Sequence, residues 1–178
     1  MARMRERIFA GFGAGLFLIS ACAATVYAVM QGGGDSTDTS QTSSQTQTCS
    51  DKQTEQALAA PEIYKTADPV TELQKTDLET GSGAEAKSGD CLVVKYYGTL
   101  ATNGTKFDED FTDTTAFAFK LGEGQVITGW DEGVPGMKVG GTRRLVIPAA
   151  KAYGATAQGS IPANSDLVFV VKLLRIQN

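Results

Sequence analysis

The residues best placed for chemistry in this chain are aromatic, and they gather around the single tryptophan, Trp130. Trp130 lies in the segment Val126–Val134, which reads V-I-T-G-W-D-E-G-V. The segment before it, Ala116–Leu121, alternates so that Phe117 and Phe119 share one face of a strand. An indole beside such a face either packs the core or forms the floor of an apolar cleft. The residues alone leave both interpretations open.

The polar chemistry available to the chain is limited by what the sequence lacks. It contains no histidine, which excludes Ser-His-Asp and Cys-His catalysis as well as histidine-based metal sites. The three cysteines, Cys22, Cys49 and Cys91, are too few and too scattered for a thiolate zinc site. Any reaction is therefore expected to proceed without an imidazole, a bound metal or a cofactor.

The charge of the chain is unevenly distributed about a net value of −4. Arg3, Arg5 and Arg7 precede an apolar run, and the chain after that run is more acidic than the whole. An acidic portion without basic clusters argues against nucleic-acid binding. Contact with anionic lipids is expected only at the three arginines.

The N-terminal segment Ile8–Met30 is an uncharged, mostly apolar run of 23 residues, long enough to cross a bilayer as a helix. The arginines before it should keep the N-terminus in the cytoplasm, so that the rest of the chain faces outward. A cleaved secretory signal is one alternative, because Ala21–Ala24 supplies small residues for cleavage. A lipoprotein signal is another, because Leu18–Cys22 resembles a bacterial lipobox in which Cys22 is lipidated. All three interpretations export the remaining chain.

Residues 31–60 are interpreted as a linker, and residues 61–178 as the folded domain. The linker is rich in Ser, Thr, Gln and Gly and cannot bury enough surface to offset its chain entropy, so it is expected to be disordered. Cys49 lies inside it, and in an oxidising exterior Cys49 could pair with Cys91. Two free thiols are the alternative, because sequence alone does not give the geometry.

The domain is predicted to be α+β, with a five- to six-stranded twisted antiparallel sheet half-wrapped around one short helix. The helix is expected to begin near Gly129, capped by Thr128, and to stop at Pro135. Because it is the only helix available to cover the apolar face of the sheet, it should carry Trp130 into the core. The predicted strands are Val70–Thr80, Cys91–Tyr97, Lys106–Phe111, Ala116–Leu121, Thr142–Ile147 and Asp166–Ile176.

Several linked motifs in this domain resemble the FKBP-type peptidyl-prolyl isomerases. They come in the family's order and spacing, which makes the resemblance specific where any one motif would be weak. The resemblance covers roughly Val70 to Ile176 and suggests a bacterial member with an N-terminal membrane anchor. The motifs are Val94–Leu100, Gly104–Asp108, Phe117–Gly122, Val126–Gly133, Met137–Gly140, Tyr153–Gly154, Ile161–Pro162 and Leu167–Phe169.

The resemblance also implies a site for the proline ring of a substrate. Trp130 would form its floor, and Ile161 would lie in the flap loop above it. Tyr153 would donate a hydrogen bond to a substrate carbonyl, the backbone N–H of Ile127 would hold a second one, and Asp108 would sit at the rim. The walls would be Tyr96, Phe107, Phe117, Val126, Ile127 and Phe169.

Isomerisation of a prolyl peptide bond suits a chain without histidine. Rotation is opposed by a barrier of roughly 18–20 kcal/mol, but no covalent bond is broken, so neither a nucleophile nor a metal is needed. The expected partners are proline-containing peptides, unfolded exported proteins and macrolide inhibitors of the family, at the outer face of the membrane. The alternative function is a non-catalytic proline-peptide-binding module or holdase with the same fold.

Overall fold

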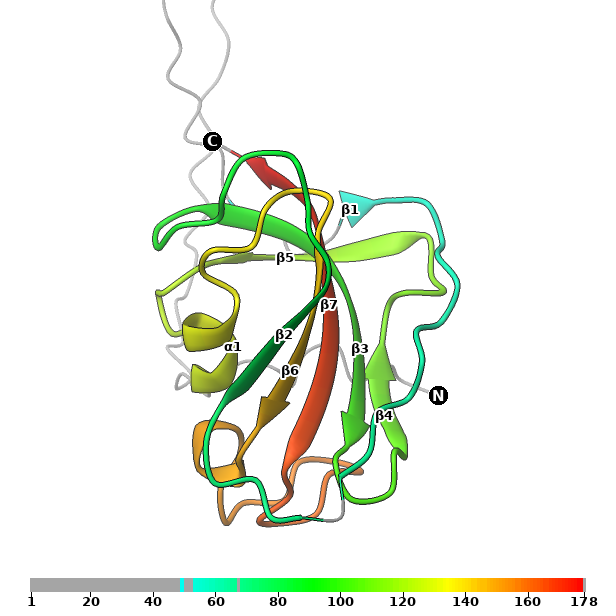
Figure 1. Ribbon diagram of the computed structural model, residues 1–178, viewed down its shortest axis with the longest axis vertical. Helices are drawn as coiled ribbons and strands as arrows, with labels where there is room; N and C mark the ends of the chain where they lie inside the picture. Colours follow the sequence, from blue (N-terminus) through cyan, green and yellow to red (C-terminus); the bar gives the residue numbers. More distant parts are fainter. Residues whose placement is uncertain (1–48, 50–52, 67, 178) are drawn as a thin grey trace, which may run out of the picture. The chain divides into compact units, whose positions relative to one another are not determined.

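The computed structural model describes residue 49, residues 53–66 and residues 68–177 (Figure 1). The predicted anchor at Ile8–Met30, its Cys22 and most of the predicted linker lie outside these residues. Within them, no helix combines the length and the apolar character needed to cross a membrane. The elements are β1 (Gln53–Thr54), β2 (Gln74–Glu79), β3 (Cys91–Leu100), β4 (Lys106–Glu109), β5 (Thr115–Lys120), α1 (Thr128–Gly133), β6 (Thr142–Ile147), the 3-10 helix η2 (Ala149–Lys151) and β7 (Leu167–Gln177).

The described part of the chain forms one seven-stranded sheet in which every pair is antiparallel. The strand order is β1-β5-β3-β7-β6-β2, and β4 pairs with the C-terminal part of β3. The predicted antiparallel sheet with one short helix is confirmed. The main differences are three. The sheet has a seventh strand, β1, from residues predicted as linker; β2 begins at Gln74 instead of Val70; and β3 runs beyond Tyr97 to Leu100, because β4 and β7 both pair with that part.

Helix α1 lies against one face of the sheet, and the core fills the space between them (Figure 1). Its close approach depends on two glycines one turn apart. A β-carbon at Gly129 would lie 2.4 Å from Ile147 Cγ2, and one at Gly133 would lie 2.8 Å from Leu145 Cδ2. The absence of these side chains lets the helix pack directly on β6, which brings Trp130 into the core.

The helix begins one residue earlier than predicted. Ile127 is the N-cap, its carbonyl accepts a hydrogen bond from Trp130 N–H at 2.9 Å, and no side chain caps the helix. The prediction that Thr128 caps it is therefore wrong, because Thr128 already belongs to the first turn. At the other end Val134 is the C-cap, directly before Pro135.

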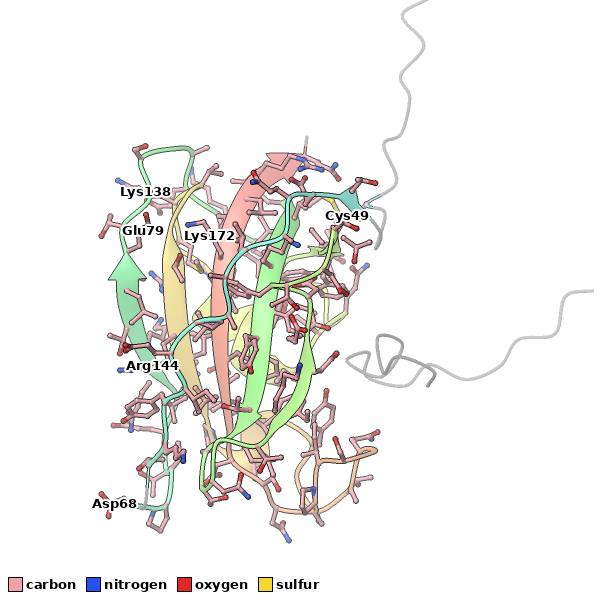
Figure 2. The ribbon with its side chains drawn as sticks, turned by 90° about the vertical axis from the view of Figure 1, so that its right-hand side faces the viewer. Cys49, Asp68, Glu79, Lys138, Arg144 and Lys172 are labelled. Carbon is pink, nitrogen blue, oxygen red and sulfur yellow. A yellow bond between two sulfur atoms is a disulfide. The ribbon has the colours of Figure 1, made fainter. Side chains whose placement is uncertain are left out.

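Residues 53–66 form an arm that crosses the outer face of the sheet, away from α1 (Figure 2). A disulfide joins Cys49 to Cys91 at the first residue of β3, with their Cα atoms 5.6 Å apart. Farther along the arm, the Arg144 guanidinium lies 3.9 Å from the centre of the Tyr64 ring. Tyr64 packs on an outer-face cluster made of Val70, Ala101, Val146 and Val168. The cysteine pair left open by the sequence is thus bonded in the structure, and it fastens the start of the arm.

Arg143 connects the end of helix α1 to the edge strand β2. Its side chain is largely buried, and Nη1 donates to Gly133 O at 2.9 Å and to Pro135 O at 3.1 Å. Nε and Nη2 donate to the two oxygens of Asp77 at 2.6 and 3.1 Å. The hydrogen bonds from Arg143 lower the pKa of Asp77, against a smaller opposing effect of burial. One guanidinium therefore satisfies carbonyls at the helix terminus that otherwise lack donors.

Replacing Arg143 with methionine should lower the free energy of unfolding by about 2–4 kcal/mol, because it leaves buried carbonyls without donors and removes an ion pair. Urea unfolding near neutral pH measures this. Because the folded state lowers the pKa of Asp77, its contribution is present above pH 3.8 and is lost as the pH falls through the lowered value. The difference between the two proteins should therefore shrink in acid, and a constant difference would contradict this account.

Candidate functional site

The site is built on a cluster of aromatic rings around Trp130. Its ring centre lies 5.6 Å from Tyr96, 6.2 Å from Phe117, 5.5 Å from Phe119 and 5.2 Å from Phe169. Each of these contacts is edge-to-face, the arrangement that the charge distribution of aromatic rings favours. Strands β3, β5 and β7 supply the partner rings, so the sheet and the helix meet at this cluster.

The structure brings the sequence-predicted site residues together. Phe107 and Tyr153 are partly buried and pack on the core cluster, and Asp108 lies beside them on β4. The remaining residues are buried members of the cluster itself, namely Tyr96, Phe117, Val126, Ile127, Trp130, Ile161 and Phe169. The predicted disulfide pair, Cys49 and Cys91, lies apart from this set, at the start of β3.

Trp130 is more covered than the floor of an open slot would be. Its exposed fraction is 0%, and no described residue accepts a hydrogen bond from its buried indole Nε1–H. A substrate ring can therefore reach the indole only if side chains above it move. Rearrangement of side chains on binding is common in proteins, and the rings of Phe107 and Tyr153, which pack on the cluster, are only partly buried.

One glycine in β3 makes room for two rings of the cluster. A β-carbon at Gly98 would lie 2.7 Å from Phe107 and 2.8 Å from Phe169. The two rings meet edge-to-face with centres 5.4 Å apart. From the sequence, Gly98 is expected only to end or bend its strand; in the structure it continues the strand and admits the rings.

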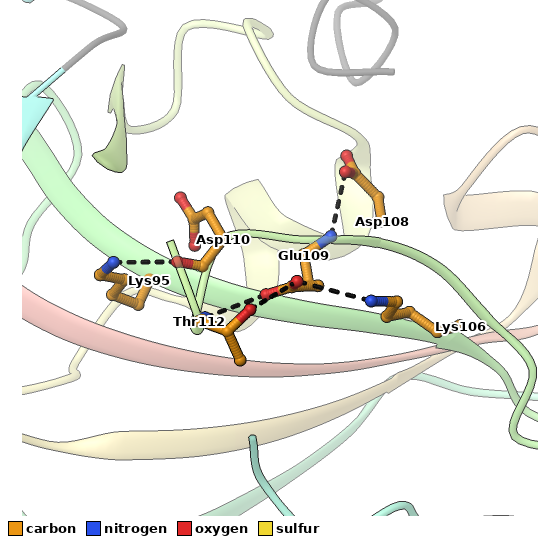
Figure 3. A network of polar contacts seen from close by, with 6 residues as sticks. All are labelled: Lys95, Lys106, Asp108, Glu109, Asp110 and Thr112. Carbon is orange, nitrogen blue, oxygen red and sulfur yellow. Dashed lines mark hydrogen bonds and ion pairs between the residues drawn. The ribbon is translucent and has the colours of Figure 1, made fainter. Parts of the chain in front are cut away.

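The Tyr96 hydroxyl and the Asp108 carboxylate form the main polar pair of the site. Tyr96 donates to Asp108 Oδ2 at 2.7 Å, and Asp108 Oδ1 accepts from the Glu109 N–H at 3.0 Å (Figure 3 shows the second bond). The carboxylate is also close enough to Tyr153 to disfavour ionisation of its phenol. Asp108 therefore interacts with both tyrosines that the sequence places in the site.

Tyr153 should keep its proton at any physiological pH. Burial, with a smaller contribution from Asp108, raises its pKa to about 12. The neutral phenol is thus a permanent hydrogen-bond donor, which is what a contact with a carbonyl oxygen requires.

Alkaline titration should reveal Tyr153 as a late-ionising group. Ultraviolet absorbance of the folded protein should contain a tyrosinate step near pH 12 that is missing in Tyr153→Phe. The unfolded phenol loses its proton first, near pH 10, so this group's contribution to stability is complete below that pH and declines as the pH rises towards 12. Ionisation of Tyr153 near pH 10 in the folded protein would contradict the assignment.

Two acidic residues that the sequence did not single out support the loops around the site. Asp131 accepts hydrogen bonds from Gly122 N–H at 2.9 Å and Gly124 N–H at 3.0 Å, which fixes the turn leading into α1. Glu109 accepts from the backbone and hydroxyl of Thr112 at 3.1 and 2.9 Å (Figure 3). Burial opposes ionisation of Glu109, but the bonds from Thr112 and the nearby Lys106 ammonium lower its pKa overall. Asp131 could have been noticed from the sequence, because an acidic residue in the first turn of a helix is favoured by the helix dipole.

The arrangement can hold an apolar ring and orient polar groups beside it. Among the described residues, none accepts a hydrogen bond from the Ile127 N–H, and no cluster of three or more histidine, cysteine, aspartate or glutamate residues could hold a metal ion. The Ile127 N–H and the Tyr153 hydroxyl are hydrogen-bond donors on residues that belong to the aromatic cluster or pack on it. This chemistry suits the binding of a peptide through its carbonyls and one ring.

Comparison with known proteins agrees with the geometry. Residues 83–174 match the family model of the FKBP-type peptidyl-prolyl cis-trans isomerases. A Saccharomyces cerevisiae peptidyl-prolyl cis-trans isomerase is 52% identical over 102 residues, which are 57% of this chain and 24% of that protein. The FK506-binding protein 4 of Neurospora crassa is 52% identical over 101 residues, 57% of this chain and 21% of that protein. The chain thus spans about a quarter of the length of these curated relatives.

Two solved structures share the fold. FkpA from Escherichia coli superposes with a TM-score of 0.55 and 42% identity, over 60% of this chain and 49% of FkpA. AtFKBP13 superposes with a TM-score of 0.56 and 32% identity, over 62% of this chain and 98% of AtFKBP13. The family model covers more than half of the chain, and the motifs that place the aromatic cluster fall inside it. The chain therefore belongs to the FKBP-type peptidyl-prolyl cis-trans isomerase family.

Proposed function

We propose that this protein is a peptidyl-prolyl cis-trans isomerase that assists the folding of exported proteins. The observation that carries the proposal is the convergence of Trp130, the rings around it, Tyr153 and the Tyr96–Asp108 pair in one place. Family membership supports it, because the curated relative from yeast carries the same activity in its name.

The chemistry asked of these residues is modest. The planar X-Pro amide must twist through a state in which conjugation is lost, and uncatalysed exchange takes tens to hundreds of seconds. The protein needs only to bind the twisted amide more tightly than either planar form. A dry aromatic surface around the proline ring disfavours the more polar planar amide. The Tyr153 hydroxyl and the Ile127 N–H would hold flanking carbonyls while the peptide turns.

The direct test is a protease-coupled assay with a proline peptide. The full chain should accelerate the slow cis-to-trans phase, and the rate should rise in proportion to protein concentration. A chain that binds the peptide but gives no acceleration at micromolar concentration would instead be a proline-peptide-binding module or holdase. The observation that favours this second candidate is the short flap at residues 155–160, which carries no aromatic side chain.

Asp108 is assigned the role of orienting the phenols, and a near-isosteric substitution tests it. Asp108→Asn still offers an oxygen to the Tyr96 hydroxyl, so kcat/KM should fall by no more than about fivefold, corresponding to roughly 1 kcal/mol between charged and neutral acceptors. Activity falling to background while the circular dichroism spectrum is unchanged would assign the essential role to the negative charge.

The proposed location is the outer face of a bacterial membrane, with the N-terminus in the cytoplasm. The Cys49–Cys91 disulfide supports an oxidising compartment, and the apolar run at Ile8–Met30 supports export. A lipidated Cys22 or a cleaved signal would give the same exposure. Because the relatives compared are fungal as well as bacterial, the source stays a prediction. Intact mass of the membrane-extracted protein distinguishes the three N-terminal states.

The proposed partners follow from the same site. They are proline-containing segments of unfolded exported proteins and, as competitors, macrolides of the kind that give the FK506-binding proteins their name. The acidic net charge argues against a nucleic acid among them. Competition by a macrolide in the peptide assay would show that both ligands use the aromatic cluster.

A further inference from the structure

A buried lysine lies directly next to the site on β3. Lys95 has an exposed fraction of 0%, and its ammonium donates to three backbone carbonyls. These are Asp110 O at 2.9 Å, Asp113 O at 2.6 Å and Thr115 O at 2.8 Å (Figure 3 shows the first). An ammonium has three N–H donors, so one side chain ties the whole loop between β4 and β5 to strand β3. Burying this charge costs free energy unless the ammonium keeps its hydrogen bonds. The three carbonyls must therefore stay within hydrogen-bond distance of Lys95, which restricts the conformation of the loop.

The same loop is held from the other side by the N-terminal arm. Leu58 N–H donates to Phe111 O at 2.6 Å, and Glu55 N–H donates to Thr114 O at 2.8 Å. The loop at residues 110–114 is therefore bound both to Lys95 of β3 and to the N-terminal arm. The loop has one internal backbone bond, from Asp113 N–H to Asp110 O at 3.2 Å, and these contacts attach it to β3 and to the arm.

The first residue of this loop, Asp110, forms two hydrogen bonds with the backbone of Tyr96. Asp110 is fully buried; its Oδ1 accepts from Tyr96 N–H at 2.7 Å, and its N–H donates to Tyr96 O at 2.9 Å. Two residues earlier, Asp108 accepts from the Tyr96 hydroxyl. The chain around β4 thus holds Tyr96 at both ends, with one carboxylate on the backbone and the other on the phenol. Asp110 lies in the loop and Asp108 lies in the adjoining strand β4, so a shift of the loop that carries the end of β4 with it would move both carboxylates.

We infer that Lys95 and Asp110 are positioning residues of the isomerase site, which fix the Tyr96 ring and its bond to Asp108 against Trp130. The inference rests on the proposed function, since the ring they hold is a wall of the proposed proline site. Neither residue touches the substrate. Displacement of a reacting group by about 1 Å can cost on the order of a hundredfold in rate, so a loosened loop should be visible in activity.

The experiment compares Lys95→Met with a matched control, Lys75→Met, on an exposed position of β2 in the same sheet. In the full chain, Lys95→Met should lower kcat/KM by about tenfold at a temperature where it is fully folded, whereas Lys75→Met should change it less than about twofold. Combination with Tyr96→Phe separates positioning from general stability. If Lys95 acts through the Tyr96–Asp108 bond, Lys95→Met should cost less than about threefold in the Tyr96→Phe background.

A fully additive double variant, or a folded Lys95→Met with unchanged kcat/KM, would overturn the inference. If Lys95→Met does not fold, Asp110→Ala gives the same test, because it removes the acceptor of the Tyr96 N–H while leaving Lys95 in place. Exchange of the Tyr96 amide hydrogen provides a readout independent of turnover: it should accelerate about tenfold in either variant and not in Lys75→Met. A wild-type chain without isomerase activity would defeat the proposed function, while amide exchange would still decide whether Lys95 holds Tyr96.

Discussion

Replacing Trp130 with leucine should reduce kcat/KM for a proline peptide by on the order of a hundredfold or more, because it removes the surface against which the proline ring is held. The indole is fully buried and meets four other rings edge-to-face, so the substitution also weakens the core. The free energy of unfolding should fall by roughly 2–3 kcal/mol, less than the 3–5 kcal/mol typical of truncation to alanine. A domain of ordinary stability would still fold.

The matched control is Phe119→Leu, which changes a ring of the same cluster outside the proposed site. Phe119 is buried, lies 5.5 Å from Trp130 between ring centres, and is not among the residues expected to line the proline site. It should destabilise the protein comparably while leaving kcat/KM within about threefold. Equal losses of activity in the two variants would mean that Trp130 serves only to pack the core. The proline site would then have to be sought elsewhere.

Removing the Cys49–Cys91 disulfide should produce the largest loss of stability available outside the aromatic cluster. The bridge joins residues 42 positions apart, and the chain-entropy relation gives about 4 kcal/mol for a loop of that length. The double variant Cys49→Ser, Cys91→Ser should therefore unfold at a markedly lower urea concentration with nearly the same slope. Reduction of the wild-type protein should have the same effect.

The control for this experiment is Cys22→Ser, which makes the same chemical change outside the bridge. Its unfolding curve should match that of the wild type when both are oxidised, and again when both are reduced. Because β1 pairs with β5 and Glu55 pairs with Arg175, part of the arm should stay in place after the bridge is lost. A double variant as stable as the wild type would show that the bridge adds no constraint to that already provided by these contacts.

The sequence was sufficient where a signal lies in neighbouring residues. Thr142–Ile147 ends in three apolar residues and is bounded by glycines and a proline, and β6 has those limits in the structure. The aromatic motifs likewise placed Trp130, Tyr96 and Phe169 in one cluster, because their order along the chain carries the family's pattern. The helix start was wrong by one residue, since the capping preference of Thr128 was outweighed by the extended backbone of Ile127.

The tertiary structure decided the features that depend on groups distant in the chain. Alternation along the strand would place Lys95 on the face that points away from the core. Only the structure shows that the loop at residues 110–114 and the start of β5 cover its ammonium and supply carbonyl acceptors for it. Arg143 finds its partners 66 residues earlier in β2 and at the end of the helix. The sequence predicts that Gly98 ends or bends its strand. The structure shows that the rings of Phe107 and Phe169 occupy the space where a side chain at this position would lie.

The sequence by itself thus determined the periodicity of the strands, the composition of the aromatic cluster and the family. These depend on side-chain type and spacing, which are local properties. The structure alone decided how far Trp130 is covered, which carboxylate holds which end of Tyr96, and that Cys49 is bonded to Cys91. Those outcomes depend on distances of a few ångströms between distant segments, and hydrogen bonds, ring packing and disulfides form only where such distances are met.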